Sequence, residues 1–551
     1  MKIVRKINFF LYSALLVTFS ISILLLAKQA SALNNGLALT PSMGWNPWNK
    51  FGCNISEQIV KEITDAIVSN DMQAAGYEYI NLDDCWQVSR DSNGNIMADP
   101  QTFPSGIKAL VDYVHSKGLK FGIYTSAGSK TCQERPGSLD YEYKDAATYA
   151  AWGVDYVKVD WCFTDDVGLN PQTQYTLWRD AIAASGRPMV FSITSWGRGL
   201  PWLWGETTGN LWRTTEDIAD NWTSMLKIAD RNWHHASFAE PGGWNDPDML
   251  EVGNGGMTLI EYRTHFSLWV IMAAPLIAGN DPRTMSAEIK EILTNPEVIA
   301  VAKDPAGIPG MVVWDNYAGL QVWSRKLQTA GERAVVLLNR TLNSATITAN
   351  WQDLGLAPGT NATVRDLWTK ADLGVYTDKF SVSVAPHGVV MVKIVGTEGT
   401  PPPKPAVTTG YLSDQSWFYA TNFWGTVERN MSNGEQAPKD GRTITLQGKK
   451  YAKGIGVHAY SDVRFYLAGN CKTFSAKVGV DDEVKNKGSV IFQVYADGIK
   501  LYDSGVMYGN TATKTVNVDI SEKQEFRLYV TSDANVDYDH ADWADAKATC
   551  N

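Results

Sequence analysis

The chain has 551 residues with a net charge of −10, and 44% of its residues are hydrophobic. This hydrophobic share allows large cores and excludes a globally disordered chain. The negative charge argues against a nucleic-acid partner and fits a neutral ligand such as a sugar, while the length allows roughly three to four domains.

The first 32 residues have the pattern of an export signal. Basic residues precede an apolar run from Phe9 to Ala27, and Ala30-Ser31-Ala32 follows as a cleavage site flanked by small residues. We predict a signal peptide over 1–32, cleaved after Ala32, and a secreted protein with no stable membrane partner. An uncleaved membrane anchor is the alternative, because the apolar run is long.

From residue 33 to residue 284, short apolar runs alternate with longer segments of helical periodicity. About eight strand-plus-helix units in roughly 250 residues predict a parallel (β/α)8 TIM barrel. An open doubly wound sheet is the alternative, but no Gly-rich phosphate loop follows the first strand. The predicted strands are 43–46, 79–84, 120–124, 156–160, 189–193, 211–215, 243–246 and 275–277.

The predicted strand over 156–160 ends in a carboxylate that suits a nucleophile. Lys158 and Asp160 lie two positions apart, so both side chains point to the same face of the strand. An ammonium group beside a carboxylate favours the ionised form and lowers the carboxylate's pKa. A structural ion pair at the end of a strand is the alternative interpretation.

Further carboxylates follow other predicted strands, and in a barrel the carboxyl ends of the strands meet at one mouth. Two carboxylates flanking a bond suffice for glycoside hydrolysis, one as nucleophile and one as proton donor. Asp160 fits the first role, and Asp217, two strands further along, fits the second. We expect their carboxyl groups about 5–5.5 Å apart, which gives retention through a covalent glycosyl-enzyme.

Other chemistries have weaker support. The sequence has no His-Glu-x-x-His, Cys-x-x-Cys or Gly-x-Ser-x-Gly motif, and we predict no metal and no cofactor. A divalent cation held by Asp83 and Asp84, or by Asp246 and Asp248, stays open as an alternative to sugar hydroxyls on the same acids.

After residue 285 the pattern changes to short strands separated by turns. This predicts an antiparallel β-sandwich over 285–395, a Pro-rich linker over 396–409 and a second β-sandwich over 410–551. The six cysteines of an exported chain indicate disulfides within each region. They are Cys53, Cys85, Cys132, Cys162, Cys471 and Cys550.

Five motifs occur in this order along residues 39–395: Met43-Gly44-Trp45-Asn46, Leu82-Asp83-Asp84-Cys85-Trp86, Lys158-Val159-Asp160, Trp212-Arg213-Thr214-Thr215 and Gly242-Gly243-Trp244-Asn245-Asp246-Pro247-Asp248-Met249-Leu250. Through these motifs and their order, the region resembles glycoside hydrolase family 27, the family of α-galactosidases and α-N-acetylgalactosaminidases.

The resemblance implies a retaining α-galactosidase with Asp160 as nucleophile and Asp217 as acid/base. It implies disulfides Cys53–Cys85 and Cys132–Cys162. It also implies a galactose-binding pocket with Asp83 and Asp84 on the sugar hydroxyls and Trp45 as the apolar wall. The predicted substrate-binding residues are Trp45, Asp83, Asp84, Tyr124, Cys132, Lys158, Ser195, Arg213 and Asp248.

Two positions depart from the family pattern. Ser195 stands where α-galactosidases usually carry a Glu that contacts the 2-hydroxyl, and a small residue resembles the α-N-acetylgalactosaminidase version. Arg198 is not the small residue expected of that enzyme, so α-galactosidase leads and α-N-acetylgalactosaminidase is the alternative. Glu216 replaces a usual Gly, and if it were close to Asp217 it would raise that residue's pKa. A non-catalytic sugar-binding protein is a third interpretation.

Residues 410–551 resemble an NPCBM-type carbohydrate-binding module. The resemblance is carried by residues 451–459 and by Asp539-His540-Ala541-Asp542-Trp543-Ala544-Asp545-Ala546. Such a module would hold the barrel near galactose-containing glycans by raising the effective concentration. A stabilising sandwich without a ligand is the alternative, and an oligomer stays open.

Overall fold

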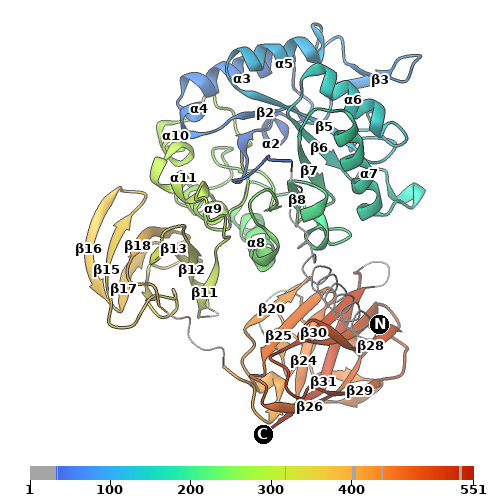
Figure 1. The fold of residues 1–551 in the computed structure, drawn as a ribbon, viewed down its shortest axis with the longest axis vertical. Coiled ribbons are helices and arrows are strands. Elements are labelled where there is room, and N and C mark those ends of the chain that lie inside the picture. The colour runs from blue at the N-terminus through green and yellow to red at the C-terminus, as the bar shows by residue number, and fades with distance from the viewer. Residues whose placement is uncertain (1–32, 34, 317, 400–404, 436–438, 533–535) are drawn as a thin grey trace, which may run out of the picture. The chain divides into compact units, whose positions relative to one another are not determined.

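The computed structural model describes residues 33, 35–316, 318–399, 405–435, 439–532 and 536–551, so the predicted signal peptide lies outside the described residues (Figure 1). These residues form two compact units, which we describe separately. The first runs to Trp314 and includes Leu320–Ala349 and Asn361–Thr397; the second is Asp315–Gly319, Asn350–Thr360 and Glu398–Asn551.

The first unit begins with an eight-stranded parallel sheet in the order β10-β1-β2-β5-β6-β7-β8-β9. The first and last barrel strands along the chain, β1 and β10, are paired, with Met43 opposite Leu276. Between β9 and β10, Leu250, shortly after β9, forms a β-bridge with Ala278 of β10. The predicted (β/α)8 architecture is confirmed. The strands are β1 Met43–Trp45, β2 Tyr79–Asn81, β5 Lys120–Ser126, β6 Tyr156–Asp160, β7 Val190–Thr194, β8 Leu211–Arg213, β9 Trp244–Asp246 and β10 Leu276–Ala278.

Helices follow the strands and surround the sheet (Figure 1). The sequence from Ile59 to Ala75 has one continuous helical periodicity, which predicts a single helix. The structure has two helices there, α3 and α4, because Asp71 between them adopts a left-handed conformation with a φ of 68°. A β3–β4 hairpin, Gln87–Arg90 and Ile96–Ala98, follows β2. The helices are α2 Trp48–Phe51, α3 Glu57–Ser69, α4 Met72–Ala75, α5 Gly106–Ser116, α6 Glu142–Trp152, α7 Pro171–Ala184, α8 Trp222–Asn232, α9 Leu259–Ile271, α10 Ala287–Thr294 and α11 Pro296–Ala302.

Polar caps and apolar faces explain where these helices lie. Ser56 caps α3 by accepting a hydrogen bond from the Ile59 N–H, and Thr258 forms a capping box with Glu261 at the start of α9. On β6, Val157 and Val159 are fully buried, as expected for a strand with helices on its outer side. The sheet core therefore holds the carboxyl end of β6, and with it Asp160, in a fixed position.

The first unit continues as an antiparallel sandwich. A six-stranded sheet has the order β11-β12-β13-β18-β15-β16, and β14 pairs with β17. Its side chains reach the barrel helix α9: the Trp368 indole N–H donates to Ser267 Oγ at 3.0 Å, and the Arg325 guanidinium donates to the Val270 carbonyl at 2.9 Å. The strands are β11 Met311–Asp315, β12 Leu320–Lys326, β13 Glu332–Asn339, β14 Ala345–Asn350, β15 Asn361–Asp366, β16 Ala371–Thr377, β17 Lys379–Val384 and β18 Val389–Val395.

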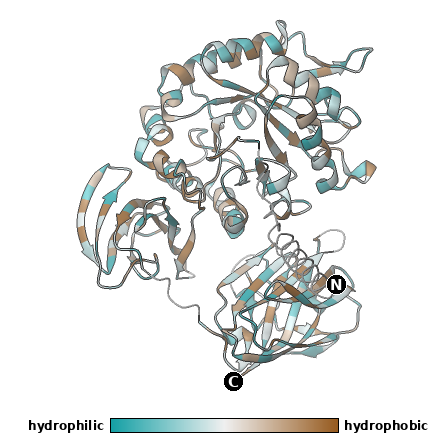
Figure 2. Ribbon diagram, in the orientation of Figure 1, coloured by the Kyte–Doolittle hydropathy of each residue, from teal (hydrophilic) through white to brown (hydrophobic). Residues whose placement is uncertain are grey.

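The second unit is a β-sandwich built around two larger sheets, one with β24, β31 and β26 at its centre and one in the order β20-β25-β30-β27-β28. Apolar residues alternate with polar ones along strands of this unit (Figure 2). The buried apolar side chains, Trp543 among them, form the core of the sandwich. Cys471 and Cys550 form a disulfide. The strands are β19 Gly410–Tyr411, β20 Tyr419–Asn422, β21 Glu428–Arg429, β22 Thr445–Leu446, β23 Lys449–Lys450, β24 Gly454–His458, β25 Ser461–Tyr466, β26 Cys471–Val480, β27 Ser489–Ala496, β28 Ile499–Tyr508, β29 Lys514–Asp519, β30 Glu525–Ser532 and β31 His540–Cys550.

Within the described part of the chain, none of the helices has the length and apolar character needed to cross a membrane.

Candidate active site

The carboxyl ends of the barrel strands bring the predicted catalytic residues to one mouth. Asp160 is the last residue of β6, Arg213 is the last residue of β8, and Asp83 and Asp84 follow β2. Asp217 lies four residues past the end of β8. Asp160 and Asp217 repel each other electrostatically, so the two carboxylates belong to one site.

Two donors hold the Asp160 carboxylate in place. Its Oδ1 accepts a hydrogen bond from the Trp161 N–H at 2.9 Å, and its Oδ2 accepts one from the Tyr124 hydroxyl at 3.0 Å. Asp160 is only 6% exposed. Burial raises its pKa to about 7, although Lys158 acts in the opposite direction. The sequence-based prediction that Lys158 leaves Asp160 with a lowered pKa is therefore wrong, because the cost of burying the charge is larger.

Lys158 makes its direct contact with a different carboxylate. Its Nζ lies 2.8 Å from Asp83 Oδ2, and Asn46 Nδ2 donates to the same oxygen at 2.7 Å. Burial disfavours the ammonium form, but Asp83, Asp160 and Asp248 outweigh it and raise the pKa of Lys158. Lys158 therefore stays charged and links β6 to the loop after β2.

Asp84 is fixed by backbone donors on two loops. The Cys85 N–H donates to Oδ1 at 2.7 Å, and the Gln133 N–H donates to Oδ2 at 3.0 Å. Burial raises the pKa of Asp84. Asp83 and Asp84 are each 2% exposed, so two adjacent acceptors are held in fixed orientations just past the carboxyl end of β2.

Two disulfides fix the loops that carry these groups. Cys53 pairs with Cys85, directly after Asp84, and Cys132 pairs with Cys162, two residues after Asp160. Both pairs are those that the family resemblance implied. Cys132 Sγ lies 3.4 Å from Asp160 Oδ2, but a disulfide sulfur has no proton to donate. Since both sulfurs are bonded to each other, they are not thiolate ligands for a metal beside Asp160.

Asp217 has a very different environment from Asp160. Its side chain is 68% exposed, and Arg213 Nη2 donates to its Oδ1 at 2.9 Å. Burial acts to raise its pKa, but Arg213 and Lys158 outweigh this and lower it. Arg213 also contacts Asp248 Oδ1 at 3.2 Å, and burial raises the pKa of Asp248 to about 6. The guanidinium therefore joins two acids of the mouth.

Glu216 is not among the groups that shift the pKa of Asp217. It forms ion pairs with Arg231 and with Lys227, the latter at 2.6 Å. Burial acts to raise its pKa, but these cations lower it overall. Its charge is compensated on the side of α8.

Two predicted sugar-binding residues lie beneath the accessible surface. Ser195 is fully buried, and its hydroxyl donates to the Arg198 carbonyl at 2.9 Å within the same loop. Trp45 is also fully buried, and its indole N–H donates to the Asn280 carbonyl at 2.7 Å. Arg198 is half exposed and pairs with Asp165 at 3.2 Å.

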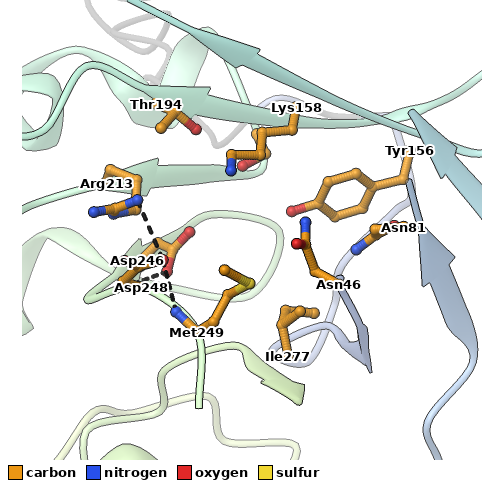
Figure 3. Close-up of a pocket in the computed structure, with 11 residues that line it drawn as sticks. Asn46, Asn81, Tyr156, Lys158, Thr194, Arg213, Asp246, Asp248, Met249 and Ile277 are labelled. Atoms are coloured by element: carbon orange, nitrogen blue, oxygen red, sulfur yellow. Dashed lines mark hydrogen bonds and ion pairs between the residues drawn. The ribbon is translucent and has the colours of Figure 1, made fainter. Parts of the chain in front are cut away.

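A small cavity of about 30 Å³ lies inside the barrel beside these groups (Figure 3). This is room for one water molecule among polar walls. Lys158, Arg213 and Asp248 were predicted from the sequence. Asp246 was considered only as a possible cation ligand, and the other lining residues, which the sequence analysis did not name as site residues, are Asn46, Asn81, Tyr156, Ser192, Thr194, Met249 and Ile277. Asn46, Asp246 and Met249 stand inside the quoted motifs, and the alternation of inward-facing residues on β6 and β7 gives Tyr156, Ser192 and Thr194.

Comparisons with known proteins match this architecture along its length. Residues 40–304 match the model described as Alpha galactosidase A, residues 317–394 the alpha galactosidase C-terminal beta sandwich domain, and residues 408–549 the NPCBM/NEW2 domain. An alpha-galactosidase of Oryza sativa subsp. japonica is 52% identical over 362 residues, which is 65% of this chain and 86% of the relative. The chain belongs to the alpha galactosidase A family.

Two further comparisons place this family member. A solved structure of alpha-galactosidase I from Mortierella vinacea has a TM-score of 0.65 and 39% identity, covering 67% of this chain and all of that one. An alpha-N-acetylgalactosaminidase of Gallus gallus is 40% identical over 386 residues, 65% of this chain and 94% of the relative. This member of the alpha galactosidase A family is a glycoside hydrolase with a carbohydrate-binding module.

Proposed function

We propose that this glycoside hydrolase releases terminal non-reducing α-D-galactose with retention of configuration. Asp160 Oδ attacks the anomeric carbon while Asp217 protonates the departing glycosidic oxygen, which breaks the glycosidic bond and forms a covalent glycosyl-enzyme. Asp217 then takes a proton from water, and the resulting hydroxide displaces Asp160. The remaining sugar-binding residues stay as proposed from the sequence, and we assign no metal or cofactor to this reaction.

One observation carries the proposal: two electrostatically linked carboxylates at the mouth have opposite environments. Asp160 is buried and held between the Trp161 N–H and the Tyr124 hydroxyl, whereas Asp217 is exposed beside Arg213. A nucleophile must be fixed in its line of attack, and a proton donor must reach the leaving group at the entrance. The two environments suit these two roles.

In the free enzyme, the proton that Asp160 and Asp217 share lies on the opposite carboxyl group from the one that must donate it in the reaction. The raised pKa of Asp160 and the lowered pKa of Asp217 mean that the pair's single proton lies mainly on Asp160 in the free enzyme. Catalysis proceeds from the form that carries this proton on Asp217. Both forms have the same total charge, so the pair titrates as a unit.

The two adjacent acids after β2 support a galactose-type sugar. Asp83 and Asp84 present fixed carboxylate oxygens that accept hydrogen bonds from neighbouring hydroxyls, and Lys158 holds Asp83 in place. The rice relative, described as an alpha-galactosidase, supports the same sugar.

α-N-acetylgalactosaminidase activity is the second candidate. Ser195 is short and turned into its own loop, which leaves no long side chain from this position against a 2-acetamido group. Turnover of p-nitrophenyl α-galactoside and its 2-acetamido analogue separates the two functions. A clear preference for the acetamido sugar would reject the first.

The test of mechanism uses Asp160→Asn and product stereochemistry. We expect no turnover in the variant, while Asp112→Asn, an exposed aspartate on α5, keeps full activity. Proton NMR of the wild-type reaction should show α-galactose as the first product. An initial β-anomer, or near-normal activity of Asp160→Asn, would contradict the double displacement.

We also propose that the protein is secreted after cleavage behind Ala32, and that its domains are 33–284, 285–395 and 410–551 with a linker at 396–409. The disulfides support export to an oxidising compartment. The module would bind galactose-containing glycans. N-terminal sequencing of the exported protein should start at Leu33, and a retained Met1 would contradict the cleavage.

A further inference from the structure

The second unit contains two buried histidines that face each other across a pair of strands. His458 ends β24 and His540 begins β31, and these residues are direct partners in the antiparallel ladder. Their rings lie 5.4 Å apart between centroids. His458 is 2% exposed and His540 is 7% exposed. Two imidazoles at such a separation inside a protein need polar partners, because an unpaired buried nitrogen is costly.

The partners of these rings orient them in a specific way. His458 Nδ1 lies 2.9 Å from the Ala459 carbonyl, an acceptor, so this nitrogen carries the proton. His540 Nδ1 lies 2.8 Å from Glu483 Oε1. In metal sites the ligating histidine donates its other ring N–H to a carbonyl or carboxylate, which leaves Nε2 for the metal. Both histidines have this arrangement.

A third ligand comes from the loop after β21. Glu435 Oε1 lies 2.7 Å from His540 Nε2. One ligand atom from each of Glu435, His458 and His540 lies within 4.8 Å of the other two. A tetrahedral ion with bonds of about 2.0–2.1 Å needs ligand atoms about 3.4 Å apart. The Glu435 side chain is 42% exposed, so it can make the small adjustment that opens space for an ion.

Strand β31 carries a further buried acid close in sequence to the histidine pair. Asp542 lies two residues after His540 on β31, so it faces the same side of the sheet. It is fully buried and shares a side-chain hydrogen bond with Asp481. Gly456 and Gly479 stand opposite it on both neighbouring strands. A cation at the three proposed ligands would therefore lie near further acidic groups.

We propose that the second unit binds a divalent transition-metal ion, Zn2+ in its physiological form, through His458, His540 and Glu435. Glu483 acts as a positioning residue for His540. Two imidazoles and one carboxylate select Zn2+ over Ca2+, which prefers oxygen ligands. Three protein ligands leave the fourth position for water or a ligand hydroxyl. The ion would connect β24, β31 and the loop that holds Glu435.

Binding is tested on the full, tag-free chain after removal of metals with a chelator. Calorimetric titration with ZnCl2 should show one equivalent bound, and Glu435→Gln should weaken the affinity at least about tenfold. Glu522→Gln, an exposed glutamate of the same unit, is the matched control and should bind like the wild type. Absence of saturable Zn2+ binding in the wild type, or the same Zn2+ affinity in Glu435→Gln as in the wild type, overturns the proposed site.

Two further measurements separate ligation from folding and from the choice of ion. Co2+ bound to the wild type should give visible ligand-field absorption that changes in Glu435→Gln, while circular dichroism of the variant stays unchanged. CaCl2 should give no equivalent binding. Stoichiometric Ca2+ binding that Glu435→Gln removes would overturn the assignment of a transition metal.

Discussion

Replacing Asp160 by Asn should stabilise the folded enzyme while it ends catalysis. Burial raises the pKa of Asp160 from 3.8 to about 7. A difference of about 3 pKa units between the unfolded and folded states corresponds to on the order of 4 kcal/mol of stability lost above neutral pH. An amide carries no charge, so the variant avoids this loss.

The local geometry accepts the amide. With its oxygen in the place of Oδ1, the amide keeps the hydrogen bond from the Trp161 N–H. Its NH2 group then replaces Oδ2 and donates to the Tyr124 hydroxyl, which turns from donor to acceptor. Lys158 keeps its partner Asp83. The substitution therefore leaves these neighbouring groups paired.

The pH dependence gives this prediction its sign. A carboxyl group whose folded pKa lies above its unfolded pKa destabilises the fold as pH rises from the lower value to the higher. The gain from Asp160→Asn should therefore be absent near pH 4 and complete above pH 7. Asp217→Asn should act in the opposite direction, because the pKa of Asp217 is lowered in the fold: it should reduce stability above pH 4.

Calorimetric unfolding at pH 4, 6 and 8 measures both variants against the wild type. The expected pattern is a raised midpoint for Asp160→Asn that increases with pH. The reasoning is refuted if Asp160→Asn and the wild type have the same unfolding midpoint at pH 8, or if the variant's midpoint is raised as much at pH 4 as at pH 8. Either result would show that the buried charge of Asp160 does not destabilise the fold.

Three further predictions concern activity. The pH profile of kcat/KM should be bell-shaped, because Asp160 and Asp217 share one proton in the active form. We expect the alkaline limb near pH 7 and the acid limb below the ordinary aspartate pKa. Undiminished activity at pH 9 would contradict this. Lys158→Met should move the alkaline limb to higher pH, because it removes the cation that favours ionised Asp160. It should also lower kcat/KM roughly 100-fold, since Lys158 holds Asp83 in place. An alkaline limb at the wild-type pH would show that Lys158 does not stabilise ionised Asp160. Glu216→Gln should leave the profile unchanged and kcat within about twofold, because Glu216 is paired with Lys227 and Arg231; a shift of the limb would show that its charge reaches Asp217.

The strand pattern and the motif order predicted the fold well because both depend on local sequence. The apolar run of β6 ends at Asp160 in the structure as it does in the sequence, and the alternation of strands and helices predicted a parallel sheet. The single helix expected over 59–75 is wrong, because Asp71 takes a left-handed conformation that the hydrophobic periodicity does not reveal.

Electrostatics depended on contacts that sequence spacing does not encode. Lys158 lies two positions from Asp160, yet its ion pair is with Asp83, which lies in the loop after β2 and is brought close by the parallel sheet. The extent of burial decides the pKa of Asp160, and burial is a property of the whole barrel. The same holds for His458 and His540: their separation in sequence matches no metal motif, and only the strand register makes them neighbours.

The pairing of β1 with β10 has a consequence for biosynthesis. Met43 leaves the ribosome early, but its partner Leu276 is made only after six other strands of the sheet. Until then, the free edges of the growing sheet present unpaired backbone groups that can join another nascent chain. Slow translation at low temperature and low chain concentration should therefore raise the yield of native enzyme during recombinant production.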